Sequence, residues 1–233
     1  MRIDVIDHAE TAKPALPAAT VLLLRDGSEG VEVLMIHRHS KTAFGGMWAF
    51  PGGVVEDADI PAGTEPDPLP AARRAAARET REEVGLVVAE TDLVFHSHWL
   101  PPADAPVRFS TWFFAGLTPG GAVEMQAGEV HDHAWLSARE ALERQRRREI
   151  ELVTPTFVTL DNLARAERAE EVLAVAEPEF FATRSVRRAD GVRLCLYHGD
   201  AGYESGDAEA AGARRRLTLD NRAGWVWEDT RRG

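Results

Sequence analysis

The chain has 233 residues, which is enough for one sizeable domain with its own hydrophobic core and an extension. Its formal net charge of −11 argues against a surface that binds nucleic acid by neutralising backbone phosphates, because such a surface needs clustered lysine and arginine. The single cysteine, Cys195, excludes an intramolecular disulfide and a zinc site built from several cysteines.

No segment for secretion or membrane insertion is recognisable. The first eleven residues lack a basic start followed by an apolar run, so no signal peptide is predicted. The longest apolar run, Ala18 to Leu24, is too short to span a bilayer. We therefore expect a cytoplasmic protein that binds neither membrane nor nucleic acid, and the sequence leaves a homodimer open.

The first part of the chain predicts two strands after a lead-in of residues 1–17. Ala18 to Leu24 is apolar throughout, which is typical of a buried strand. Residues 26–30 have turn chemistry, and Val31 to Arg38 then predicts a returning strand.

The next segment predicts a turn and a helix. The turn is Phe50-Pro51-Gly52-Gly53. Asp67-Pro68 or Pro70 suits a helix start, and Gly85 suits a helix end. On that helix Glu79, Glu82 and Glu83 stand at positions i, i+3 and i+4, so the three carboxylates share one face.

Three like charges on one face destabilise a helix, so the presence of these carboxylates together needs an explanation. One interpretation is a solvated acidic face. The other is a metal site, because carboxylate oxygens are the ligands that Mg²⁺ or Mn²⁺ prefer. The glycine turn upstream favours the metal site, because glycine lets a backbone carbonyl of the turn approach closely and join the carboxylates.

The rest of the chain alternates predicted strands and helices. Ser137 to Glu140 is a capping box that predicts a helix, and Thr154-Pro155 predicts the start of another. Residues 200–212 are acidic and contain glycine, which indicates a flexible loop. The predicted strands are Leu93–Leu100, Val107–Leu117, Val123–Met125, Val130–Leu136, a hairpin within Arg184–Tyr197, Arg214–Leu219 and Trp225–Trp227.

The segment from Gly53 to Leu86 resembles the Nudix box, which runs Gly, five residues, Glu, seven residues, then Arg-Glu-x-x-Glu-Glu-x-Gly and an apolar residue. Arg78 to Leu86 matches the last nine positions, with Thr80 at a usually aliphatic position. Asp59 stands where the first Glu is expected. Gly53 and Arg78 are 25 positions apart where the plain box has 14, so 11 residues are inserted, and we expect residues 57–70 to hold them as a surface loop.

The resemblance implies a Nudix α/β/α sandwich with a mixed sheet over residues 18–150. Residues 151–233 would then form a C-terminal extension, first helical and then rich in strands. The implied activity is metal-dependent hydrolysis of a nucleoside diphosphate linked to another moiety, with Mg²⁺ or Mn²⁺ as cofactor. A bound divalent ion lowers the charge of the diphosphate and the pKa of the attacking water.

The resemblance also implies roles for single residues. Glu82 and Glu83 match metal ligands, Glu79 a ligand or the general base, and the Gly52 carbonyl a further ligand. Arg78 would pair with the box carboxylates and orient them. A further Glu from a later loop often serves as ligand or base, for which Glu129 is the candidate and Glu124 its competitor.

Three residues are candidates for binding the substrate. Arg38 is one, because a guanidinium fork matches phosphate oxygens, and a surface ion pair is the alternative. Gly53 opens the box, and Trp99 at a strand end is a candidate for stacking a base.

A fainter resemblance concerns the substrate. Residues 96–116 and 187–200 are similar to the acyl-coenzyme A diphosphatase branch, which also carries an insert within its box. Gly46 fits the coenzyme A signature upstream of the turn, whereas Thr42 replaces its arginine. This points to coenzyme A or acyl-coenzyme A. The alternatives are ADP-ribose, a dinucleotide, or a catalytically silent Nudix module that binds a nucleotide and regulates a partner.

Three His-x-His pairs raise a different hypothesis. Residues two apart on a strand share a face, so each pair could contribute to a zinc site. Nothing in the sequence places the pairs together, and strand-end histidines or substrate contacts are the preferred interpretation. The pairs are His37/His39, His96/His98 and His131/His133.

Overall fold

The computed structural model describes residues 14–39, 45–60, 68–125, 130–174 and 177–231, and the chain divides into two compact units. The box unit comprises the described residues of Pro17–His98 and Thr111–Glu179. The tail unit comprises the described residues of Met1–Leu16, Trp99–Ser110 and Phe180–Gly233.

The larger sheet has the strand order β3-β2-β1-β6-β5-β8, with β4 paired to β1 and β7 paired to β2. Its pairings are mixed. Strand β1 is antiparallel to β2 and β4, whereas the Thr118 N–H donates to the Leu24 carbonyl and the Leu16 N–H to the Arg108 carbonyl, so β1 and β6 run parallel. The strands are β1 (Leu16–Gly27), β2 (Gly30–Arg38), β3 (Trp48–Ala49), β4 (Gly52–Val54), β5 (Val94–Leu100), β6 (Phe109–Leu117), β7 (Val130–Ser137) and β8 (Glu179–Ala182).

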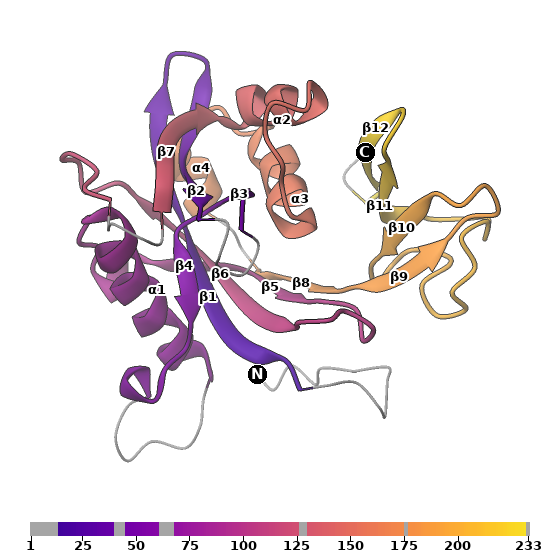
Figure 1. Ribbon diagram of the computed structural model, residues 1–233, viewed down its shortest axis with the longest axis horizontal. Coiled ribbons are helices and arrows are strands. Elements are labelled where there is room, and N and C mark those ends of the chain that lie inside the picture. Colours follow the sequence, from indigo (N-terminus) through magenta and orange to yellow (C-terminus); the bar gives the residue numbers. More distant parts are fainter. Residues whose placement is uncertain (1–13, 40–44, 61–67, 126–129, 175–176, 232–233) are drawn as a thin grey trace. The chain divides into compact units, whose positions relative to one another are not determined.

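Helices cover both faces of the strands in the box unit. Figure 1 shows α1 on one side and α2 and α3 on the other. Small side chains let α1 lie close to the sheet, because Ala72, Ala75 and Ala76 are fully buried in one cluster with Val21 and Leu23 of β1. The predicted α/β/α sandwich is therefore confirmed. The helices are α1 (Pro68–Val84), α2 (Ala138–Arg146), α3 (Thr154–Leu163) and α4 (Ala169–Leu173), with 3₁₀ turns η1 (Asp57–Asp59) and η2 (Glu90–Asp92).

Local chemistry explains where these helices begin and end. Gly85 follows α1 with φ 70°, and its N–H donates to the Arg81 carbonyl, which is the predicted helix end. The predicted helix start at Ser137 is also confirmed, since the Ser137 hydroxyl accepts the Glu140 N–H at 3.1 Å.

One predicted strand of the box unit is wrong. Val123–Met125 has no strand structure. Instead the Glu124 N–H donates to the Val84 carbonyl at 3.0 Å, so this segment satisfies a carbonyl at the C-terminal end of α1.

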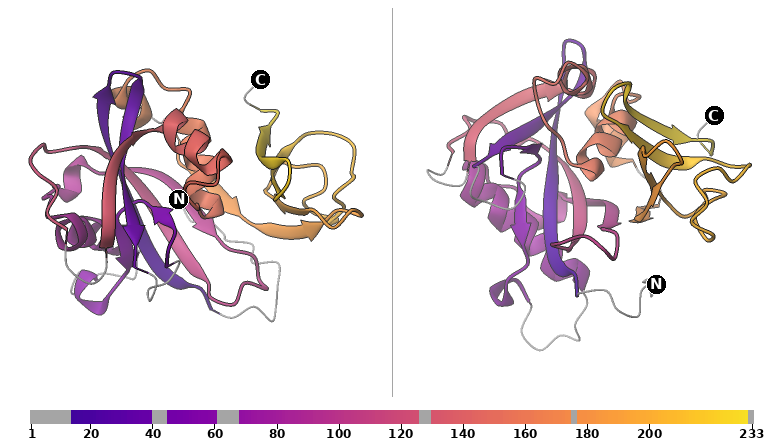
Figure 2. Two further views of the ribbon diagram at one scale, coloured as in Figure 1. Left: turned by 45° about the horizontal axis from the view of Figure 1, so that its top comes forward. Right: turned by 45° about the vertical axis from the view of Figure 1, so that its right-hand side comes forward.

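The tail unit contains a second, four-stranded antiparallel sheet in the order β12-β11-β10-β9, drawn in orange to yellow in Figure 2. Cys195 and Leu196 of β10 pair with Ser185 and Arg184 of β9, which confirms the predicted hairpin. The strands are β9 (Arg184–Arg187), β10 (Arg193–Leu196), β11 (Arg215–Asp220) and β12 (Gly224–Asp229).

The loop predicted at residues 200–212 is confirmed, because the segment has turns and no helix or strand, but it is anchored to the sheet. Tyr203 and Ala208 are buried in one cluster with Leu194 and Leu196. The Asp200 carboxylate is fully buried against the guanidinium of Arg216. Apolar burial and an ion pair therefore hold this segment against the sheet.

The insert of the box is also more structured than predicted. Of residues 57–70, Asp57–Asp59 form a 3₁₀ turn and residues 68–70 begin α1, while 61–67 lie outside the described part of the chain. Asp59 is only 4% exposed, so this end of the insert is anchored. In the residues that the structure describes, no helix is long and apolar enough to cross a membrane.

Candidate active site

The glycine turn is fixed to the central strand of the box unit. The Thr20 hydroxyl of β1 donates to the carbonyls of Phe50 and Pro51, and the Val21 N–H donates to the Pro51 carbonyl at 2.9 Å. A Cβ at position 52 would lie 2.2 Å from the Ala19 carbonyl oxygen, so only glycine fits there. The turn can therefore present the Gly52 carbonyl in a fixed direction.

The three box glutamates lie on α1 beside this turn, with different exposure. Glu83 is 1% exposed, and its carboxylate accepts the Gly52 N–H at 2.8 Å. Glu79 is close to Gly53, where an added Cβ would lie 2.3 Å from a Glu79 carboxylate oxygen. The Glu82 side chain is 41% exposed. Gly53 thus leaves space that the Glu79 carboxylate uses, whereas the Gly52 N–H holds the Glu83 carboxylate.

Arg38, at the end of β2, reaches the same turn. Its Nη1 donates to the Gly52 carbonyl at 3.0 Å and lies 3.3 Å from the Glu83 Oε1. A register shift between His37 and Arg38 interrupts the β2–β7 pairing, and such irregularities change the direction of a side chain. The structure therefore brings Arg38 together with Gly52 and Glu83.

Arg78 connects the start of the insert to the helix. Its Nε and Nη2 donate to both Asp59 carboxylate oxygens at 3.1 and 2.9 Å, a two-pronged pair. Its Nη1 donates to Glu79 at 2.8 Å and Glu82 at 3.0 Å, and its Nη2 also donates to the Val54 carbonyl. The pKa of the Arg78 guanidinium is raised, first by Asp59, and by Glu79 and Glu82 against the effect of burial, so the group stays charged.

Asp59 is the residue whose role sequence reasoning missed. Counting from Gly53 identifies it as the occupant of an expected Glu position, but shows nothing of its partner. The 3₁₀ turn η1 brings the shorter carboxylate to Arg78, and the Asp59 side chain also accepts the Glu56 N–H at 2.9 Å. Glu56 itself is exposed.

Thr80 occupies the position that is usually aliphatic, yet it is fully buried. Its hydroxyl donates to the Ala76 carbonyl one turn earlier at 2.8 Å. The polar group is thereby satisfied within the helix, so the departure from the box pattern leaves no unpaired hydroxyl in the core.

The donor chemistry of this cluster fits a hard divalent cation. Three glutamate side chains and a backbone carbonyl supply only oxygen donors, which Mg²⁺ and Mn²⁺ prefer. Within the described residues, no three His, Cys, Asp or Glu side chains already form a metal-binding group. The carboxylates instead contact Arg38 and Arg78, so holding a cation requires some of these side chains to turn.

The remaining predicted site residues lie elsewhere. Glu129 lies outside the described residues, and its competitor Glu124 is exposed beside Gly85. Trp99 belongs to the tail unit, is 3% exposed and stacks on Phe181 with ring centroids 3.8 Å apart. One face of the Trp99 ring is thus covered, and its stacking on a base stays a prediction.

The structure brings together histidines that the sequence left apart. Because β2 pairs with β7, the His131 ring lies 5.6 Å from the His37 ring and 6.4 Å from the His39 ring. His37 also stacks on Trp48. The buried His98 stacks on Trp112, and burial lowers the pKa of His98 to about 4, so it is neutral at pH 7.

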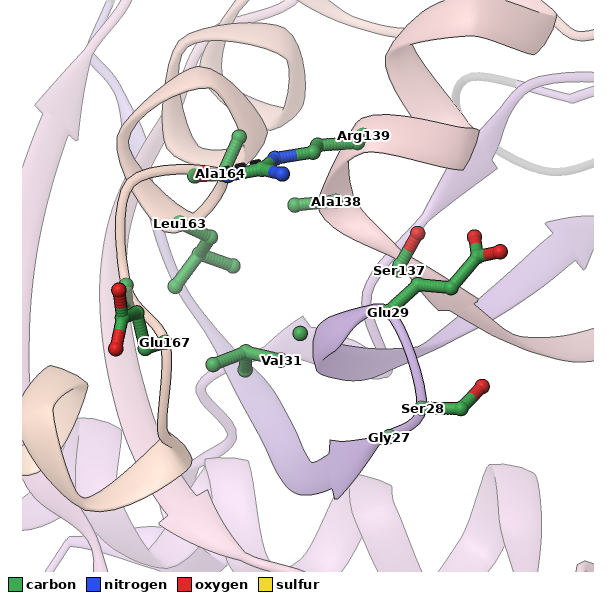
Figure 3. Close-up of a pocket in the computed structure, with 12 residues that line it drawn as sticks. Gly27, Ser28, Glu29, Val31, Ser137, Ala138, Arg139, Leu163, Ala164 and Glu167 are labelled. Carbon is green, nitrogen blue, oxygen red and sulfur yellow. Dashed lines mark hydrogen bonds between the residues drawn. The ribbon is translucent and has the colours of Figure 1, made fainter.

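A separate pocket lies at the β1–β2 turn of the box unit (Figure 3). Its volume is about 640 Å³, and it is lined by residues from the turn, from the start of α2 and from the end of α3, among them Glu29, Arg139 and Leu163. It shares no residue with the glycine turn or with the glutamate face of α1.

Comparisons with known proteins identify similar domains and structures. A model of the NUDIX domain matches residues 14–157. A crystal structure of a NUDIX hydrolase from Alicyclobacillus acidocaldarius is similar with a TM-score of 0.63 and 26% identity, over 70% of this chain and 97% of that one.

Two further solved structures are similar at lower scores. The NUDIX domain of Shewanella oneidensis NrtR, complexed with ADP ribose, has a TM-score of 0.49 and 18% identity over 64% of this chain and 86% of that one. A MutT NUDIX hydrolase from Burkholderia pseudomallei has a TM-score of 0.48 and 17% identity over 64% and 98%. A search of curated proteins found no match.

Proposed function

Because the chain belongs to the Nudix family and is a hydrolase of that family, we propose that its substrate is a nucleoside diphosphate linked to a second moiety, cleaved within the diphosphate with Mg²⁺ or Mn²⁺ as cofactor. The observation that carries the proposal is the convergence of Glu79 and Glu83 on the Gly52–Gly53 turn, with Glu82 joined to Glu79 through Arg78. When bound, the divalent ion supplies charge neutralisation and an activated water.

The residues of the chain then have distinct tasks. Glu82, Glu83 and the Gly52 carbonyl hold the cation, and Glu79 is a further ligand or the general base. Glu129 and Glu124 remain the candidates for an additional ligand or base. The absence of a side chain at Gly53 leaves space for Glu79 and for the substrate.

The two arginines have different partners: Arg78 binds carboxylates of the protein, and Arg38 is proposed to bind the substrate. Arg78 is held by Asp59 and orients Glu79 and Glu82, so it is a positioning residue. Arg38 is the candidate for a substrate phosphate, because its guanidinium lies at the turn and can present a fork to phosphate oxygens.

For the second moiety we propose coenzyme A or an acyl-coenzyme A. The two segments with the fainter resemblance to acyl-coenzyme A diphosphatases are 96–116 and 187–200. Residues 99–110 of the first and all of the second fall in the tail unit, which also holds Trp99. The coenzyme A assignment thus rests on the similarity of these two segments.

A substrate panel tests the proposal. Coenzyme A, an acyl-coenzyme A, ADP-ribose and a diadenosine polyphosphate are incubated with Mg²⁺, with Mn²⁺ or with EDTA, and products are resolved by mass. We expect metal-dependent cleavage, with 3′,5′-ADP and a 4′-phosphopantetheine product from the coenzyme A compounds. Turnover that persists in EDTA would contradict the role of the cation, and intact compounds throughout would contradict the proposed substrate class.

A further inference from the structure

Arg38 contacts two of the oxygens that the proposed function assigns to a cation. A single nitrogen, Nη1, lies 3.0 Å from the Gly52 carbonyl oxygen and 3.3 Å from Glu83 Oε1. Mg²⁺ lies about 2.0–2.1 Å from its oxygen ligands. A guanidinium at these distances and a divalent ion on the same oxygens would be two cations in near contact, which Coulomb repulsion opposes.

Hydrogen bonds fix the backbone of Arg38, but one donor of its side chain lacks a hydrogen-bond partner among the described residues. Its N–H donates to the Met47 carbonyl at 3.1 Å, and its carbonyl accepts the Gly46 N–H at 3.0 Å. Its Nε is buried and has no hydrogen-bond partner in the described part of the chain. A phosphate could accept from both Nε and an Nη, so a second side-chain position would satisfy a donor that the first leaves unpaired.

From this geometry, and on the basis of the proposed function, we propose that Arg38 and the divalent cation compete for Gly52 and Glu83. The cation displaces the guanidinium from these two oxygens, and the released guanidinium then binds a phosphate of the substrate. Arg38 thus has two alternative anions, one in the protein and one in the substrate, and the cation determines which of them it binds.

The competition has a consequence that a purely supporting role would not have. If Arg38 mainly held Gly52 and Glu83 in place, the loss of its hydrogen bonds would offset the removal of its charge, and cation binding would weaken or stay unchanged. If it competes, Arg38→Gln binds the cation more tightly. We expect Mn²⁺ to bind at least about fivefold more tightly to Arg38→Gln than to the wild type.

Electron paramagnetic resonance of free Mn²⁺, titrated into the full chain without substrate, measures this affinity. The matched control is Arg144→Gln, which removes an arginine paired with Glu140 on α2 and should stay within about twofold of the wild type. Mn²⁺ binding that is unchanged or weaker in Arg38→Gln overturns the competition alone. A wild type that binds no Mn²⁺ overturns both the competition and the metal-dependent function.

A second measurement on the wild type covers the case in which Arg38→Gln does not fold. The ¹⁵N NMR signal of the Arg38 Nε–H is assigned by its disappearance in Arg38→Lys and followed during a titration with diamagnetic Mg²⁺. We expect the signal to shift and to exchange faster with solvent as the guanidinium leaves Gly52 and Glu83. A signal unchanged at saturating Mg²⁺ would overturn the proposal.

Discussion

Arginine–carboxylate contacts occur in both units of the chain, but with a different balance of charge. In the box unit four carboxylates, Asp59, Glu79, Glu82 and Glu83, contact two guanidinium groups among the described residues. In the tail unit the side chains of Asp200 and Arg216 are 0% and 5% exposed and form a two-pronged pair. The first cluster has an excess of negative charge, whereas the second pair is neutral.

The difference separates a binding site from a structural contact. An excess of carboxylates attracts cations, and at 41% exposure the Glu82 side chain can reach solvent. For Asp200, burial alone would raise the pKa, but hydrogen bonds from Arg216 and from the Arg215 and Gly202 N–H groups outweigh it, so the pKa is lowered. Its stabilising effect is present above the unfolded pKa of 3.8 and is lost as the pH falls through the lower folded pKa.

The largest effect is expected from breaking the neutral pair. Asp200→Asn keeps the size of the side chain but leaves the Arg216 charge buried without its partner. We expect the free energy of unfolding to fall by about 3–5 kcal/mol, which urea denaturation followed by tryptophan fluorescence measures. The control, Asp190→Asn, removes an exposed partner of Arg188 and should change much less. A similar midpoint for both variants would contradict a structural role for the buried pair.

The second-largest effect is expected in the carboxylate cluster of the box unit, which has excess negative charge. Glu82→Gln and Glu83→Gln keep the shape of the side chains but remove charged ligands, so we expect kcat to fall at least about 100-fold. Glu90→Gln is the control, because Glu90 is an exposed glutamate paired with Arg74. Circular dichroism verifies that the buried Glu83 variant is folded. Near-normal turnover in either variant would remove that glutamate from the ligand set.

The box was predictable from the sequence because its determinants are local. Gly85 ends α1, Ser137 begins α2, and the spacing of Glu79, Glu82 and Glu83 sets one helix face. Each of these features depends on residues within a few positions of one another. The same holds for the two strands that precede the box.

The errors of prediction arose where the deciding partner is distant in sequence. Residues 200–212 have loop composition, and the contacts that anchor the segment are not local, as in the pair of Asp200 with Arg216, which is 16 residues away. Asp59 and Arg78 are 19 residues apart, so the insert was predicted as a surface loop. The His37–His131 contact depends on the β2–β7 register, which no local pattern determines.

A smaller effect is expected from the residue that holds Arg78. Asp59→Asn removes the charge of the two-pronged pair, and Arg78 would then orient Glu79 and Glu82 less well. We expect kcat to fall about 10- to 100-fold, as is usual for residues that support metal ligands. Asp57→Asn, at an exposed position of the same turn, is the control and should retain full turnover. Full turnover in Asp59→Asn as well would show that Arg78 needs no such anchor.

The smallest effect concerns the second moiety of the substrate. If the substrate is a coenzyme A compound, binding energy from its remote pantetheine or acyl arm can be used at the reacting phosphorus. Substrates that lack the arm should then lose turnover as well as affinity. The comparison is kcat/KM for coenzyme A, an acyl-coenzyme A and ADP-ribose under one metal condition, with coenzyme A compounds expected to be preferred. A preference for ADP-ribose of more than about tenfold, on the order of 1.4 kcal/mol in transition-state binding, would exclude the coenzyme A assignment. The assignment of a metal-dependent diphosphatase would survive that result, because the glutamate face and the glycine turn belong to the box unit.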